Sequence, residues 1–363
     1  MRTLTLVLIA LCVAASCLAQ GEDAPKLERT AAQATEHANA LRALYDKHKE
    51  AFKDINGGAS VHETSIEGTL KLCEEHAGRI QNLEQNVIPE IQPVLSAVLE
   101  LWGDPEIKPE ETAAQDPVVL FAMKQSAEIE WNMKQVGAQD LDRVSTCFVD
   151  LTRMLNDVGK TRKANGEYLA NDAENLYSPE MIAFYTEDIR VPKLQEAKTL
   201  LGWALKFDAK NEYANARMAT IDAEIAALEK QLEADTDART WAGNVADFPG
   251  PGSTSELAAA ALSYLRNDKD WGKAENGTEV LAVCVRGGWQ PADRDLFGRI
   301  ISWRLPVHVA ATRPALKARG IARVYELSMV AREGAPGNAP KAPPFDGFWV
   351  GDSWNIRLNK LPQ

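Results

Sequence analysis

Aromatic and basic side chains suited to ligand binding gather in the last 93 of the 363 residues. Five of the nine tryptophans lie in this stretch, namely Trp271, Trp289, Trp303, Trp349 and Trp354. It also carries the arginines Arg299, Arg304, Arg313 and Arg357. Because aromatic and arginine side chains dominate binding hot spots, we expect a ligand site here rather than in the preceding helices.

The segment Gly347 to Leu358 predicts a strand with two distinct faces. Strict alternation puts the apolar residues on one face: Phe348, Val350, Trp354, Ile356 and Leu358. The other face then carries Trp349, Gly351, Ser353, Asn355 and Arg357. A tryptophan among polar neighbours can stack on a sugar ring. The candidate ligand-binding residues are therefore Trp349, Ser353, Asn355 and Arg357, with His308 from the polar face of another strand. The alternative is that Trp349 covers a second core layer and His308 is a plain surface residue.

Catalytic and cofactor motifs are absent from the sequence. No His-Glu-x-x-His, P-loop, Gly-x-Ser-x-Gly or Gly-x-Gly-x-x-Gly pattern occurs, so we assign no catalytic residue, metal site or cofactor. An enzyme acting on an envelope polymer stays open as an alternative. It would use His308 with Asp293, Asp295 or Asp352, since an imidazole and a carboxylate can share acid and base roles.

Residues 1–19 have the pattern of a secretory signal peptide. Arg2 is followed by an apolar run from Leu4 to Ala15, and Cys17 and Ala19 supply small residues before the expected cleavage site. The protein is therefore expected to be exported, to the periplasm or the medium. The alternative is an imperfect lipobox in which Cys17 becomes a lipidated N-terminus. No stretch is long and apolar enough to predict a transmembrane helix.

Three cysteines remain beyond the predicted leader: Cys73, Cys147 and Cys284. Cys73 lies on the apolar face of a predicted helix and Cys284 in an apolar strand, so we interpret them as small buried residues. A Cys73–Cys147 disulfide is the alternative.

Charge is divided unevenly along the chain. The net charge is −12, whereas residues 270–363 contain 13 Lys and Arg against 9 Asp and Glu, a net of +4. The acidic helices argue against binding of nucleic acid, which needs a basic surface.

Residues 20–248 predict an all-α bundle of three or four long, heptad-patterned helices. Asn56-Gly57-Gly58 should end the first helix, and the capping box Ser60 to Glu63 should open the second. A 3.5-residue apolar repeat then runs from Ile66 to Leu101, with Pro89 and Pro93 expected to kink or split it near Val87. The remaining expected boundaries are an Asp116-Pro117 start with an end near Gln135, a stop at Asn165-Gly166, and a short helix opened by Ser178-Pro179.

Residues 196–221, within a helix pair over 192–235, resemble part of a tetratricopeptide repeat. The resemblance rests on the small and apolar residues Ala197, Leu200, Leu201, Ala204, Leu205 and Ala214, and on the turn Asp208-Ala209-Lys210-Asn211. The proline that this family has in the turn is missing, and no second copy follows at 34 residues. The resemblance implies a helix-pair surface for a protein or peptide partner.

A proline- and glycine-rich linker at 249–254 should separate the bundle from a small α+β domain, residues 255–363. That domain should begin with a short helix capped by Ser255 and contain about four strands: Val280–Val285, Leu305–Thr312, Ile321–Arg332 and Gly347–Leu358. The nearly all-apolar first strand is expected at the centre of the sheet. The fold class predicted for the whole chain is α+β.

The favoured function is an exported, non-catalytic binding or scaffold protein. Its helices would serve a protein partner or act as a spacer, and its C-terminal module would bind a ligand or an envelope component. The alternatives are the envelope-polymer hydrolase and a structural protein that oligomerises through coiled-coil seams.

Overall fold

The computed structural model describes residues 28–109, 116–335, 339–341 and 345–362. The predicted signal peptide, Cys17 included, lies outside them. The chain divides into two compact units, Met1–Leu176 with Glu196–Ala219, and Tyr177–Gln195 with Thr220–Gln363. The predicted linker at 249–254 lies inside the second unit, because two helical stretches before it contact the sheet.

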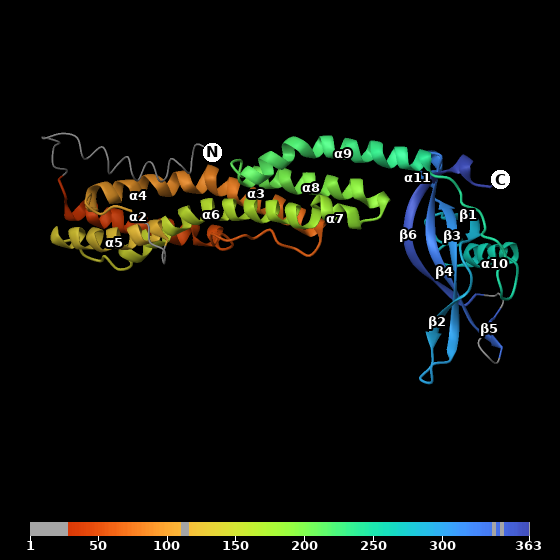
Figure 1. The fold of residues 1–363 in the computed structure, drawn as a ribbon. Helices are drawn as coiled ribbons and strands as arrows, with labels where there is room; N and C mark the ends of the chain where they lie inside the picture. Colours follow the sequence, from red (N-terminus) through yellow and green to blue (C-terminus); the bar gives the residue numbers. More distant parts are fainter. Residues whose placement is uncertain (1–27, 110–115, 336–338, 342–344, 363) are drawn as a thin grey trace. The chain divides into compact units, whose positions relative to one another are not determined.

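The first unit is helical and the second joins helices to an antiparallel sheet, so the protein is α+β as the sequence predicts (Figure 1). The helices up to the linker are α2 (Ala31–His48), η1 (Lys49–Phe52), α3 (Ile66–Asn82), η2 (Leu83–Val87), α4 (Ile88–Trp102), α5 (Pro117–Gln135), α6 (Val144–Tyr177), α7 (Pro179–Phe184), α8 (Glu187–Phe207) and α9 (Glu212–Ala238). In the first unit α4 packs against both α2 and α5. No helix in the described part of the chain combines the length and the apolar character that a membrane span requires.

Several helix boundaries follow directly from local chemistry. The Asp116 carboxylate accepts the N–H of Val118, and Pro117 opens α5, which ends at Gln135 as predicted. The long repeat splits at the π-helical turn η2, where the N–H of Ile88 bonds to the Leu83 carbonyl. The predicted split near Val87 is confirmed, and its cause is Pro89, which cannot donate a backbone hydrogen bond. Pro93 does not split the helix, since it lies inside α4.

Two other predicted boundaries are wrong for tertiary reasons. Ser60 does not cap α3; its N–H donates to Asn165 Oδ1 at 2.8 Å, and Ser65 caps instead. Nor does α6 stop at Asn165-Gly166, since Asn165 is fully buried inside it. A Cβ on Gly166 would lie 2.8 Å from Asp208 Cβ, so glycine here allows a close approach rather than a stop.

Helices α8 and α9 are joined by a tight turn at residues 208–211. Asp208 Oδ1 accepts the N–H of Lys210 at 3.0 Å, and Asn211 Oδ1 accepts the N–H of Ala214 at 2.9 Å. Such side-chain caps stabilise any turn between two helices. These caps do not distinguish a tetratricopeptide helix pair from other helix pairs. The resemblance of residues 196–221 to a tetratricopeptide repeat therefore stays a prediction.

The sheet of the second unit has six strands within the described residues: β1 (Glu279–Val285), β2 (Gln290–Arg294), β3 (Ile300–Thr312), β4 (Ile321–Ala335), β5 (Ala339–Pro340) and β6 (Gly347–Arg357). The sequence predicts four of them and misses the short β2 and β5. All pairs are antiparallel, in the order β1-β3-β4-β6, with β2 beside β3 and β5 beside β4. The 5-residue helix α11 (Pro314–Ala318) joins β3 to β4, and η3 (Leu358–Lys360) follows β6.

The expected central position of β1 is wrong, because among the described strands it pairs only with β3. Its apolar character has another cause. The segment at 243–245 covers its outer edge, where Val245 donates to the Val285 carbonyl and Asn244 Oδ1 accepts the N–H of Val285. A covered edge strand can be as apolar as a central one.

The sheet buries residues on both of its faces. Helix α10 (Thr254–Asn267), capped by Ser253 and Glu256 rather than Ser255, lies along one face. There Leu257, Ala261 and Leu265 pack on strand residues Leu305, Val307, Val309, Leu327 and Met329. The other face has a smaller core at one end, made of Ala282, Ala310, Ala322, Val324 and Ile356. Farther along that second face Glu326 and Trp349 are exposed, and Pro306, His308 and Ser328 are partly exposed.

Candidate functional site

A β-bulge in β6 separates the residues that the sequence placed on one face. Leu327 pairs with Val350 but Tyr325 pairs with Ser353, so β6 has one more residue than β4 between these pairs. Because alternation shifts by one at a bulge, Ser353 lies on the opposite face from Trp349. The prediction that Trp349, Ser353, Asn355 and Arg357 share a face is wrong. Trp349 instead shares a face with Trp354.

Two of the three residues beyond the bulge, Asn355 and Arg357, have structural partners in the second unit. Arg357 donates through Nε to Asp237 of α9 at 2.6 Å and also pairs with Glu233, and these bonds raise its pKa. The backbone N–H of Asn355 donates to Glu187 Oε2 at 3.2 Å, and its carbonyl accepts from Arg239. Glu187 and Arg239 therefore cover this part of the free edge of β6.

Trp349 stands on the open part of the second sheet face. Its side chain is 47 % exposed, whereas its neighbour Phe348 packs edge-on against Trp271 in the core. The strand register puts Ser328 and Pro306 in one row with Trp349, and the flanking rows contribute Glu326 with His308 and Arg304 with Val330. We name this surface the Trp349 face; its residues are Arg304, Pro306, His308, Glu326, Ser328 and Trp349.

His308 belongs to the Trp349 face, as its predicted polar position requires. Its Nε2 lies 3.7 Å from a Glu326 carboxylate oxygen, and its ring meets that of Trp354 edge-on at 5.0 Å. Burial and, to a smaller extent, the charge of Arg286 lower the pKa of His308. The imidazole is therefore mostly neutral at pH 7 and can both donate and accept a hydrogen bond.

The carboxylates considered for a hydrolase are not gathered around His308. Asp293 pairs with Ser302, six residues along β3 from His308, which corresponds to roughly 20 Å along a strand. Asp295 is held in the β2–β3 turn, where Arg299 Nε donates to it at 2.7 Å. Asp352 lines a separate hollow. The carboxylate that lies directly across the strands from His308 is instead that of Glu326.

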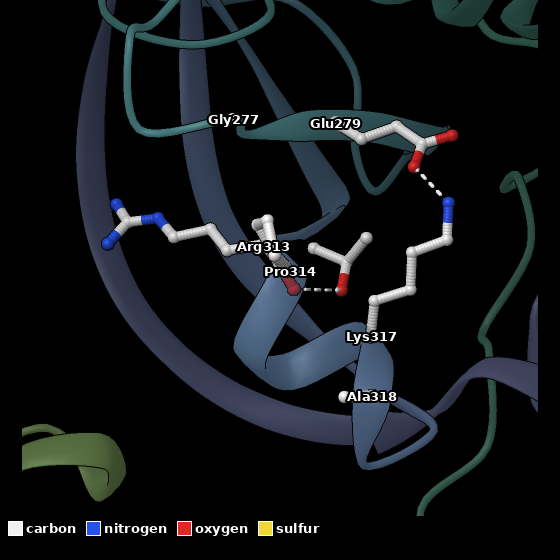
Figure 2. Close-up of a pocket in the computed structure, with 7 residues that line it drawn as sticks. Gly277, Glu279, Arg313, Pro314, Lys317 and Ala318 are labelled. Carbon is white, nitrogen blue, oxygen red and sulfur yellow. Dashed lines mark hydrogen bonds and ion pairs between the residues drawn. The ribbon is translucent and has the colours of Figure 1, made fainter.

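A hollow of about 330 Å³ lies where β1, β3 and α11 meet (Figure 2). Its main charged groups, Lys317 Nζ and a Glu279 carboxylate oxygen, pair at 2.7 Å. The Thr312 hydroxyl donates to the Ile321 carbonyl at 2.9 Å, and Figure 2 shows the Arg313 guanidinium pointing away from the Glu279–Lys317 pair. Because its central groups already bond to one another, this hollow is a weaker candidate than the Trp349 face.

A larger hollow of about 530 Å³ lies beside β6 and contains Ser353 of the predicted set. Its guanidinium groups are engaged: Arg239 binds both carboxylate oxygens of Glu187, and Arg190 donates to the carbonyls of Tyr185 and Ala183. The Phe184 ring is 85 % exposed at its rim. The hollow offers that ring, Ser353 and Asp352 to a small polar molecule.

The three cysteines and the described histidines do not form a second candidate site. Cys73, Cys147 and Cys284 are free and buried, so the alternative Cys73–Cys147 bridge is not formed. Burial raises all three thiol pKa values, that of Cys73 to about 12, which makes the thiols poor nucleophiles. Over the described ranges, no three His, Cys, Asp or Glu side chains come together in a way that could hold a metal ion.

Comparison with known proteins yields no relative. No protein-family model, no curated protein and no solved structure matches this chain. Any functional conclusion must therefore come from the geometry of its own residues.

Sequence reasoning missed Glu326 and Ser328, the cross-strand neighbours of His308 and Trp349. Their alternation in Ile321–Arg332 marks them as outward-facing. What no local pattern supplies is the register that puts them beside those two residues.

Proposed function

We propose that this protein is an exported, non-catalytic binding protein whose sheet recognises an envelope polysaccharide through the Trp349 face. The observation that carries the proposal is the half-exposed indole of Trp349 on an open sheet surface lined by hydrogen-bonding side chains. An indole stacks on the apolar face of a sugar ring, and flanking polar groups bind its hydroxyls.

The neighbours of Trp349 favour a neutral, hydroxyl-rich ligand over a charged one. Glu326 accepts, Arg304 donates, and Ser328 and neutral His308 can do both. One carboxylate and one guanidinium leave no strong net charge at the centre of the surface. Since the face lies on a sheet surface outside both hollows, it suits an extended polymer better than an enclosed small molecule.

The helical first unit would then act as a spacer or as the surface for a protein partner. Its long antiparallel helices support a spacer, because they extend about 1.5 Å per residue. The tight turn between α8 and α9 is compatible with a tetratricopeptide-like helix pair, so a partner-binding surface on this pair remains part of the proposal.

The test is binding of the full chain to immobilised peptidoglycan and to soluble polysaccharides, with wild type compared with Trp349→Ala. Loss of the stacking ring should weaken binding by about 1–2 kcal/mol, roughly five- to thirtyfold in Kd. Binding should persist at high salt, because stacking and neutral hydrogen bonds are little screened.

Trp131→Ala is the matched control. Trp131 is 61 % exposed on α5, in the other unit, so its loss removes an indole somewhat more accessible than that of Trp349. Equal weakening by the two substitutions would indicate non-specific adsorption. Unchanged binding in Trp349→Ala would remove the Trp349 face from the function.

A further inference from the structure

The hairpin that joins β2 to β3 presents two large apolar side chains to solvent. Leu296 is 100 % exposed and Phe297 is 86 % exposed. Both lie at the turn, and Figure 1 shows this hairpin projecting beyond the neighbouring strands of its sheet. Single exposed apolar residues are ordinary, but two adjacent ones at a projecting tip form a candidate interaction surface.

The turn is held in one conformation by Asp295. One of its carboxylate oxygens accepts the N–H groups of Phe297 and Arg299, each at 2.9 Å. The other accepts Arg299 Nε at 2.7 Å, and the N–H of Gly298 donates to the Asp295 carbonyl. Gly298 has φ +80°, which glycine adopts without strain. The exposure of Leu296 and Phe297 is therefore built into the turn.

Arginine flanks the apolar pair on both strands of the hairpin. Arg294 donates to the Gly298 carbonyl at 2.7 Å, and the side chain of Arg299 stays 74 % exposed although it pairs with Asp295. A guanidinium has five N–H groups, so these bonds leave donors for a further anion. Two nearby carboxylates are engaged in hydrogen bonds, since Asp295 holds the turn and Asp293 accepts from the Ser302 hydroxyl, whereas Glu333 acts on Arg299 through its charge alone.

We propose that this tip, Arg294 to Arg299, inserts Leu296 and Phe297 into the interfacial layer of a bilayer with anionic headgroups. The tip is convex, so it can enter the headgroup region without a matching pocket. Apolar side chains partition into that layer, and the flanking arginines contact lipid phosphates. The chain as a whole carries −12, which would repel it from such a surface, so attraction must come from the net +4 of residues 270–363 and from the arginines of the tip.

The experiment is cosedimentation of the full-length protein with vesicles of phosphatidylcholine, with and without phosphatidylglycerol. Wild type should bind the vesicles containing phosphatidylglycerol reversibly and bind less in about 0.5 M salt than in about 0.1 M salt. The double variant Leu296→Ser/Phe297→Ser should bind at least about tenfold more weakly. Both side chains are fully or almost fully exposed, so the variant should keep the wild-type circular dichroism and melting temperature.

Met123→Ser/Trp131→Ser is the matched control. These residues are 53 % and 61 % exposed on α5, and their replacement should leave vesicle binding unchanged. Equal losses in the two double variants would overturn the assignment to the hairpin. Absence of wild-type binding to vesicles, including the case in which the tip binds an isolated protein instead, would overturn the membrane proposal. Equal binding with and without phosphatidylglycerol would overturn its anionic component.

Discussion

At the scale of single residues, the hydrogen bond between Trp102 and His37 makes the stability of the first unit depend on pH. Trp102 is completely buried, and its indole N–H donates to Nδ1 of His37 at 2.9 Å. That nitrogen can accept only while it carries no proton. Burial lowers the pKa of His37 from 6.5, and Glu36 opposes this only in part. Burial, followed by Arg79, also lowers the pKa of His76.

We predict that the stability of the first unit falls as the pH drops below about 6.5. The unfolded chain protonates these histidines at their ordinary pKa, whereas the folded chain resists until lower pH. In that window the unfolded state binds more protons, so stability rises with pH and is fully present above it. The loss should be about 1.4 kcal/mol for each unit of pKa depression.

Urea unfolding between pH 8 and pH 5, followed by helical circular dichroism, measures this slope. His37→Asn is the informative variant, because its side-chain oxygen can still accept from Trp102 but does not titrate. Its unfolding midpoint should depend less on pH than that of wild type. Equal slopes in the two proteins would show that His37 does not contribute.

At the scale of elements, the bulge in β6 decides which core each side chain enters. Before the bulge Phe348 faces α10 and Trp349 faces outward, whereas beyond it Ile356 belongs to the second core. Gly351 approaches the Glu326 carbonyl so closely that a Cβ would lie 3.3 Å from it. A single extra residue thus allows one strand to serve two cores on opposite faces.

We predict that deletion of Asp352 destabilises the sheet by more than about 3 kcal/mol. Removing one residue restores strict alternation, which would turn Trp354 and the fully buried Ile356 away from the second core. Asp352→Ala keeps the chain length and should change stability by no more than about 0.5 kcal/mol. Denaturant unfolding followed by tryptophan fluorescence would compare them, and equal stabilities would contradict the role given to the bulge.

The same bulge shows what the sequence could and could not predict. Helix ends were predictable where the signal is local, as at Asp116-Pro117 and at the break near Val87. Asn165-Gly166 has the composition of a stop, yet its residues serve contacts with Ser60 and Asp208 that are distant in sequence. The strand at 347–358 was predicted, but an extra residue leaves no mark in an alternating pattern. The faces of Ser353, Asn355 and Arg357 were therefore misassigned.

At the scale of the whole molecule, the second unit includes a stretch of chain that is distant in sequence from the strands of its sheet. Residues Tyr177–Gln195 belong to it, more than 80 residues before β1 in the sequence. From this stretch Asp188 pairs with Arg323 of β4, which is only 8 % exposed. Burial opposes ionisation of Asp188, but Arg323 and Thr186 outweigh it and lower the pKa of this carboxyl.

Arg323 depends strongly on this one partner. Its Nε and Nη2 atoms are buried and find no hydrogen-bond acceptor in the part of the chain that the structure describes. Removing Asp188 would leave a buried guanidinium without its carboxylate. This costs more than the ion pair contributes, because the desolvated charge remains.

We predict that Asp188→Ala destabilises the sheet by about 2 kcal/mol, less than for a fully buried pair because Asp188 is partly exposed. Amide hydrogen exchange should accelerate roughly thirtyfold in β4 and β6 and stay unchanged in α2 to α5. The double variant Asp188→Ala/Arg323→Met removes the orphaned charge and should recover most of the protection. If Asp188→Ala left β4 and β6 protected, the sheet would not depend on its distant helical stretch. If the double variant exchanged as fast as the single one, loss of contact rather than an unpaired charge would be the cause.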